Sequence, residues 1–208
     1  MSIQPAEIAE AWLTSFADAC KEATESKSTD QVVSHFLPHG WWRDRICLTW
    51  DFRTAEGHEK IASFIGANAA LAKAGFTNLK IDTTSALGGP VMKQIPVPGM
   101  DKPLDAIEFS FRFELAHPAG VGRALATLAQ DHGPNKEWKA FLLLTSLEHL
   151  KGHEPNLTPP TGHYEGHTRT WDDVHAEELA AVEKDHTVLV VGGGHAESSL
   201  LFDCATWE

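Results

Sequence analysis

Asp44 is the residue of this chain whose surroundings best suit acid–base chemistry. It lies in the alternating run 41–52, whose even positions are otherwise apolar and include Trp42, Ile46 and Trp50. A carboxylate on such an inward face loses hydration, which raises its pKa and suits it to act as a general acid or base. The alternative is structural and carries equal weight, because buried carboxylates also accept hydrogen bonds from turns or pair with arginines. The arginines nearest in sequence are Arg43, Arg45 and Arg53.

The chain contains twelve histidines, so the presence of a histidine is by itself weak evidence for a catalytic role. His39 is the one we expect to work with Asp44, because it precedes the same strand closely and an imidazole titrates near neutral pH. The alternative for His39 is an exposed loop histidine before Gly40. His149 and His153 are four residues apart, as are His163 and His167, yet neither pair forms the HExxH pattern of a zinc site, and we expect no metal.

Aromatic residues dominate the expected substrate-binding surface. Seven tryptophans and one tyrosine favour an apolar ligand, aromatic or polycyclic, although such side chains more often form plain core. The substrate-binding candidates are Trp42, Trp50, Phe64, Phe109, Phe111, His58 and Glu148. For Glu148 the alternative is a solvated position near the end of a strand.

A glycine-rich run near the C-terminus is typical of the start of a dinucleotide-binding domain. Val188–Val191 precede three glycines, but Glu197 stands where the third glycine of GxGxxG should allow close helix packing. A complete unit also needs a second strand and an acidic ribose contact. We therefore expect no flavin or nicotinamide cofactor and interpret 186–208 as the vestigial start of a Rossmann-like domain. The alternative is that Val188–Val191 add an edge strand to the preceding domain.

Hydrophobic periodicity predicts helices followed by strands. The spacing of apolar residues predicts helices over 5–23, 29–36 and 56–74, with Gly75 as a left-handed cap, and a short acidic helix over 171–184. Strands are predicted over 41–52, 76–83, 106–116, 121–130 and 138–150. The last of these is apolar on both faces, which suits a central strand or a sheet face covered by a second subunit. This order predicts an α+β fold.

Charge and composition exclude several classes of partner. Seventeen Lys and Arg residues oppose 29 Asp and Glu residues, and the net charge of −12 disfavours nucleic acid and anionic membranes. Three widely spaced cysteines form neither a disulfide framework nor a metal motif, so a reducing, cytoplasmic setting is expected. No segment has the run of apolar residues that a membrane span requires.

Three segments resemble the N-terminal domain of fungal flavin-dependent monooxygenases. They are Phe36-Leu-Pro-His-Gly-Trp-Trp-Arg-Asp44, Leu48-Thr-Trp-Asp-Phe-Arg53 and the run from Trp138 to Glu154, which ends in Leu-Lys-Gly-His-Glu. That domain is similar to the nuclear transport factor 2-like fold, which also contains polyketide cyclases, scytalone dehydratase and limonene epoxide hydrolase. The resemblance implies helices packed on a strongly curved antiparallel or mixed sheet, forming a cone with an internal pocket. It also implies that the flavin domain is truncated.

These observations predict a cone domain over 1–150, an extended arm with a short helix over 151–185, and the remnant over 186–208. The leading hypothesis is a cofactor-free enzyme of secondary metabolism, a cyclase, isomerase, dehydratase or epoxide-opening catalyst, that moves protons with Asp44 and His39. The alternative is a non-catalytic ligand-binding or dimerisation module, marked by a filled cone with Trp42 packed on Phe111. A fragment left by a premature stop is a third possibility. We expect a homodimer formed through sheet faces.

Overall fold

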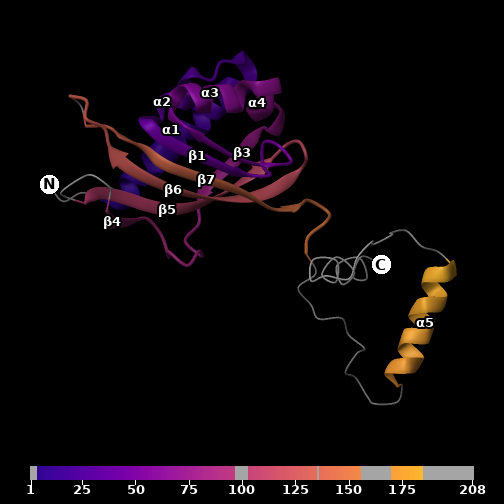
Figure 1. Ribbon diagram of the computed structural model, residues 1–208. Coiled ribbons are helices and arrows are strands. Elements are labelled where there is room, and N and C mark those ends of the chain that lie inside the picture. The colour runs from indigo at the N-terminus through magenta and orange to yellow at the C-terminus, as the bar shows by residue number, and fades with distance from the viewer. Residues whose placement is uncertain (1–3, 97–102, 135, 156–169, 185–208) are drawn as a thin grey trace. The chain divides into compact units, whose positions relative to one another are not determined.

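A seven-stranded mixed sheet forms the framework of the N-terminal part of the chain. The structure is a computed structural model that describes residues 4–96, 103–134, 136–155 and 170–184. The strands are β1 (Phe36–Arg45), β2 (Phe52–Glu56), β3 (Phe76–Ile81), β4 (Val91–Ile95), β5 (Leu104–Leu115), β6 (Gly120–Gln130) and β7 (Trp138–Leu150). Their order is β2-β1-β7-β6-β5-β3, with β4 also paired to β5, and only β1 and β7 run parallel among these pairs. The sheet is curved, as predicted, and it is open (Figure 1).

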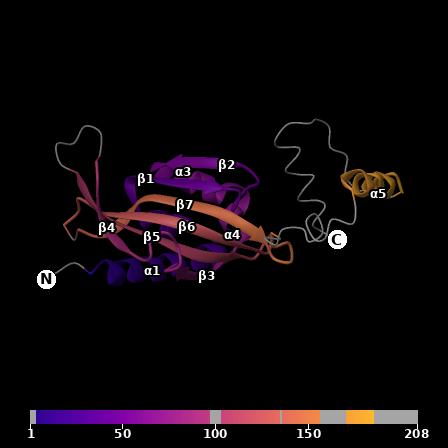
Figure 2. The same ribbon diagram turned by 90° about the horizontal axis from the view of Figure 1, so that it is seen from below.

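Helices cover one face of this sheet (Figure 1). They are α1 (Pro5–Ser26), α2 (Asp30–Ser34), α3 (Gly57–Gly66), the short 3-10 helix η1 (Ala67–Ala69) and α4 (Ala70–Ala74). Figure 2 shows the same arrangement from below, where the long strands β5, β6 and β7 run side by side. The α+β class and the layer of helices on a mixed sheet are therefore confirmed.

Aromatic rings fill the space between α1 and the sheet. Trp12 and Phe16, one helical turn apart on α1, stack with ring centroids 4.8 Å apart, and Phe16 also meets Trp42 of β1 at 6.0 Å. The alternation predicted for β5 is confirmed, because its inward phenylalanines, at 109, 111 and 113, are all at most 1 % exposed. Burying side chains of this size contributes a large share of the folding free energy. The centre of the domain is thus packed core.

The run 41–52 is two strands and a turn instead of one strand. β1 ends at Arg45, Ile46 has a φ of 57°, and β2 begins at Phe52. Trp50 in the turn is 69 % exposed and Phe52 at the start of β2 is 66 % exposed, so the inward face predicted for these two residues was wrong. A positive φ is uncommon for a branched residue, and it reverses the chain direction here.

Three other predictions need correction. The helix predicted over 56–74 is interrupted, because Asn68 and Ala69 adopt positive φ values of 51° and 54° between α3 and α4. The second helix ends at Ser34, and the strand β4 was not predicted. Gly75 does adopt the predicted left-handed conformation, with a φ of 61°, and closes α4.

The chain divides into two units, residues 1–154 and 155–208. In the second unit, α5 (Trp171–Lys184) has the predicted bounds. The glycine-rich run and the predicted remnant over 186–208 lie outside the described residues. Among the described helices, none has both the length and the apolar character that crossing a bilayer demands.

Candidate functional site

A cavity of about 870 Å³ lies beside the aromatic core. Its walls come from the β1–β2 turn, β2, α3, η1, α4 and the β5–β6 turn. The lining residues are Ile46, Cys47, Leu48, Thr49, Trp50, Arg53, Thr54, Ala55, Lys60, Ser63, Phe64, Ala67, Asn68, Ala70, Lys73, Ala74, His117 and Pro118. The volume falls in the range of small-molecule sites, about 300–1,000 Å³.

Asp44 holds the turn that forms one wall of this cavity. One of its carboxylate oxygens, Oδ2, accepts hydrogen bonds from the backbone N–H groups of Cys47 (3.2 Å) and Leu48 (3.0 Å). These two residues line the cavity, whereas Asp44 is 0 % exposed and lies behind them. The sequence left two structural contacts open for Asp44, hydrogen bonds from a backbone turn or an ion pair with an arginine. The structure shows the hydrogen bonds from a backbone turn.

The other oxygen of Asp44 ends a buried chain of hydrogen bonds. The indole Nε1–H of Trp42 donates to Thr145 Oγ1 at 3.0 Å, and the Thr145 hydroxyl donates to Asp44 Oδ1 at 2.6 Å. The parallel pairing of β1 with β7 sets this geometry, because Asp44 and Thr145 are register partners. All three side chains are fully buried, so each polar group depends on the next.

Burial raises the pKa of the Asp44 carboxyl, and the hydrogen bonds from Thr145 and from the turn oppose that rise. Removal from water disfavours the charged form, while donors aimed at the carboxylate favour it. The pKa of the neighbouring Cys47 thiol is also raised, first by burial and then by the charge of Asp44. A raised carboxyl pKa is what general acid–base work requires, although this carboxyl does not itself line the cavity.

Basic side chains stand around the cavity. Arg53 comes from β2, Lys60 from α3, Lys73 from α4 and His117 from the β5–β6 turn. Of these, Arg53 is paired with the exposed Asp51 at 3.1 Å. Among the lining residues, all of which are described, none is Asp or Glu.

Two of the predicted substrate-binding residues, Trp50 and Phe64, line the cavity. Trp42 lies beneath Phe64, with ring centroids 6.2 Å apart, and belongs to the core. Phe111 is also core, tilted against Phe109 at 6.1 Å.

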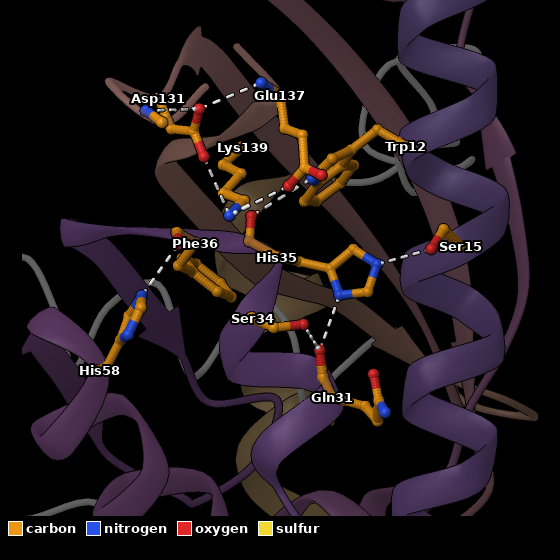
Figure 3. Close-up of polar contacts among 11 residues, drawn as sticks. Trp12, Ser15, Gln31, Ser34, His35, Phe36, His58, Asp131, Glu137 and Lys139 are labelled. Atoms are coloured by element: carbon orange, nitrogen blue, oxygen red, sulfur yellow. Dashed lines mark hydrogen bonds and ion pairs between the residues drawn. The ribbon is translucent and has the colours of Figure 1, made fainter. Parts of the chain in front are cut away.

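Three other predicted site residues lie away from the cavity lining. His39 is exposed on β1, five positions before Asp44, and the two residues are separated along the strand by Gly40 to Arg43. His58 donates from Nε2 to the backbone carbonyl of Phe36 at 2.9 Å (Figure 3). Glu148 pairs with Arg123 at 3.2 Å. The roles proposed for them stay predictions.

His35 forms a second polar cluster, between α1 and α2 (Figure 3). Its Nδ1–H donates to the carbonyl of Gln31 at 2.8 Å, so its Nε2 accepts from the Ser15 hydroxyl, also at 2.8 Å. Burial lowers the pKa of the imidazole, as does the nearby charge of Lys139, while the bond to Gln31 opposes this shift. The neutral ring thus joins α1 to the end of α2.

Sequence reasoning missed the cavity residues Lys60, Lys73 and His117. Of these, His117 is the titratable residue nearest to acid–base chemistry. It lies in the turn between β5 and β6, and its backbone N–H donates to the carbonyl of Ala74 at 3.3 Å. That contact brings it beside α4, 43 residues earlier in the chain. The adjacent Pro118 indicates a turn in the sequence, but nothing local indicates which helix the turn meets.

The described residues of the first unit define an α+β domain with helices on one face of a curved, open mixed sheet and a cavity beside its core. No protein-family model matches the chain, and no curated protein matches it.

Solved structures do match, and among them are proteins described as nuclear transport factor 2-like or as having a cystatin-like fold. One is a protein of unknown function from Shewanella oneidensis, 12% identical over 69% of this chain and 99% of that one, with a TM-score of 0.42. Another is a superfamily member from Salmonella enterica, 18% identical over 77% and 93%, with a TM-score of 0.40. A third is a hexachlorocyclohexane dehydrochlorinase from Novosphingobium barchaimii, 12% identical over 68% and 88%, with a TM-score of 0.42. The likeness concerns the fold alone.

Proposed function

We propose that the domain binds a small, largely apolar organic molecule in the cavity bounded by the β1–β2 turn, α3 and α4. The observation that carries this proposal is the cavity itself, which stands open at about 870 Å³ beside a core that aromatic rings fill. Its lining combines apolar and aromatic surface with a few polar groups, the usual composition of a ligand site.

Phenylnaphthylamine, a neutral dye that fluoresces in apolar surroundings, tests the proposal. We expect it to bind the full-length protein, and Ser63→Trp to weaken that binding by about tenfold or more, because the added ring would fill the cavity. Glu59→Trp is the matched control, since it places the same ring on α3 at an exposed position outside the lining. Equal dye binding by Ser63→Trp and Glu59→Trp would contradict the proposal that the dye binds in the cavity.

Acid–base catalysis without a cofactor is the second candidate function. It is favoured by a specific arrangement, in which His117 lines the cavity and the buried carboxyl of Asp44, with its raised pKa, lies directly behind Cys47 and Leu48. Such groups suffice to protonate an epoxide, carbonyl or alcohol and to remove a proton from carbon. Here His117 would exchange the proton, and Asp44 would supply charge and position the turn.

Turnover assays separate catalysis from binding. Purified protein without added flavin is incubated with aromatic epoxides, ketones and secondary alcohols, and the products are followed by mass spectrometry. We expect His117→Gln and Asp44→Asn to lose turnover while both still bind phenylnaphthylamine. Turnover that survives both substitutions would remove these residues from the chemistry.

We also propose that the domain descends from the N-terminal domain of flavin-dependent monooxygenases and serves in secondary metabolism. The resemblance of the Trp-Trp-Arg-Asp and Leu-Lys-Gly-His-Glu segments supports this origin. A homodimer through the sheet is proposed with it, because the face of β7 away from the helices carries Leu142 and Leu144, neither fully buried. Sedimentation equilibrium tests the dimer, which Leu144→Lys should dissociate.

A further inference from the structure

The charge of the cavity differs from the charge of the whole protein. Residues 1–154 contain 19 Asp and Glu residues and 15 Lys and Arg residues, a net charge of −4, yet the lining includes Arg53, Lys60 and Lys73, and no carboxylate. The carboxyl of Asp44 lies behind the lining and bonds to the backbone of Cys47 and Leu48. The side chains of the lining therefore carry net positive charge in a unit that is itself weakly acidic.

Lys60 and Lys73 supply most of the net positive charge of the lining. Arg53 is offset by its ion pair with Asp51, whereas no ion pair with a described residue is seen for Lys60 or Lys73. They reach the cavity from different helices, α3 and α4, whose backbones hold them at separate points of the wall. Lys60 lies in one stripe of α3 with Ser63 and Phe64, so α3 presents a cation next to an aromatic ring.

Thr49 adds a hydrogen-bond donor without an assigned acceptor. It lines the same cavity, and its buried Oγ1 has no hydrogen-bond partner among the described residues. An unpaired buried hydroxyl costs free energy, which an acceptor on a ligand would recover.

We propose, resting on the ligand-binding function above, that the cavity's ligand is an organic anion with an apolar body and one anionic group set between Lys60 and Lys73. The apolar body lies against Phe64 and Trp50, and the anionic oxygen atoms accept from the two ammonium groups and from Thr49. Positive side chains gathered in a cavity raise the encounter rate for such a molecule and add modestly to its affinity.

Two dyes with the same aromatic body test the charge directly. Anilinonaphthalene sulfonate carries one negative charge, and phenylnaphthylamine lacks it. With the full-length protein we expect the sulfonate to bind more tightly. Lys60→Met/Lys73→Met should weaken sulfonate binding by about five- to tenfold and leave the neutral dye unchanged, since each partly exposed pair contributes only a modest amount. Raising the salt concentration should weaken the sulfonate alone.

Matched controls locate the effect in the cavity. Lys21→Met removes an exposed lysine of α1 that does not line the cavity, and it should change neither affinity. Thr49→Val should weaken the sulfonate by a few-fold, and Ser63→Trp should displace both dyes.

The outcomes separate this inference from the function on which it rests. If neither dye binds, the ligand-binding function itself is overturned. If both bind with equal affinity and the double lysine variant changes neither, binding stands and the anionic ligand is overturned. A sulfonate that stays bound in Ser63→Trp, or that is lost equally in Lys21→Met, would place its site elsewhere on the surface and overturn the inference as well.

Discussion

At the scale of the residue, Thr145 is the link on which two buried polar groups depend. Thr145→Val keeps the shape of the side chain but leaves the indole N–H of Trp42 without its acceptor and Asp44 Oδ1 without its donor. We expect the free energy of unfolding to fall by about 2–4 kcal/mol, since each buried group left unpaired costs roughly 1–3 kcal/mol. Urea unfolding followed by tryptophan fluorescence measures the loss.

Thr14→Val is the control for this substitution. Its hydroxyl donates to the carbonyl of Glu10 at an exposed position on α1, so the change should stay within about 0.5 kcal/mol. Equal unfolding midpoints for Thr145→Val and the unaltered protein would show that the buried chain adds nothing to stability.

The charge of Asp44 gives the second prediction. Because the folded pKa is raised above 3.8, the contribution of this group to stability is fully present below that pH and is lost as the pH rises through the folded pKa. Asp44→Asn removes the titration. The unfolding free energy of the unaltered protein should therefore decline relative to that of Asp44→Asn as the pH rises above about 4.

Urea midpoints of the two proteins, measured in parallel across that range, isolate Asp44, because every other titrating group is shared. The sign of the difference in unfolding free energy between the two proteins tests the prediction. A difference that grows in favour of Asp44 as the pH rises would mean that its carboxylate is stabilised on folding, contrary to the burial described above.

At the scale of the element, the strands and helices with strong periodicity could be predicted and the connections could not. The inward phenylalanines of β5 and the four-residue spacing on α1 report the core face directly. The alternation from Ile46 to Phe52 has the same period but arises in a turn, where a positive φ at Ile46 overrides the pattern. Periodicity cannot separate these cases, because it contains no information on backbone direction.

The candidate site was predicted only in part, and for a related reason. The alternation over 41–52 suggested Asp44 and Trp50, and the apolar face of the helix predicted over 56–74 suggested Phe64; of these, Trp50 and Phe64 line the cavity. Lys73 and His117 enter the cavity through long-range packing of α4 on the β5–β6 turn. No local pattern in the sequence specifies that contact, and it supplies much of the cavity's polar character.

The junction of α1 and α2 yields a third prediction, which concerns pH. The pKa of His35 is lowered on folding, so its contribution to stability is present above about pH 6.5 and is lost as the pH falls through the lower folded value. His35→Gln cannot be protonated. Between pH 7 and about pH 5, the unaltered protein should lose stability relative to His35→Gln.

Ser34→Ala serves as the control at this junction, because it removes a hydroxyl bonded to Gln31 without touching a titrating group (Figure 3). Its midpoints should follow those of the unaltered protein at every pH. If the unfolding midpoints of His35→Gln also follow those of the unaltered protein at every pH, protonation of His35 does not affect the stability of this junction.

At the scale of the whole molecule, the negative charge is distributed unevenly along the chain. Residues 155–208 carry −8 of the net charge of −12 and residues 1–154 carry −4, while the lining of the cavity includes cations from three elements. The proposed ligand, one small anion, would therefore meet positive side chains in a unit whose own net charge is only weakly negative.

The final prediction concerns which residues are needed to fold. Among the described residues, every member of the hydrophobic core cluster lies between Ala9 and Leu143, within the first unit. We expect residues 1–154 alone to unfold within about 1 kcal/mol of the full chain and to bind phenylnaphthylamine equally well. A chain ending at residue 137 lacks the central strand β7, and with it the partners of β1 and β6, so it should fail to fold. Circular dichroism and urea unfolding of the three chains decide the matter, because a clearly lower midpoint for 1–154 would assign a stabilising role to residues 155–208.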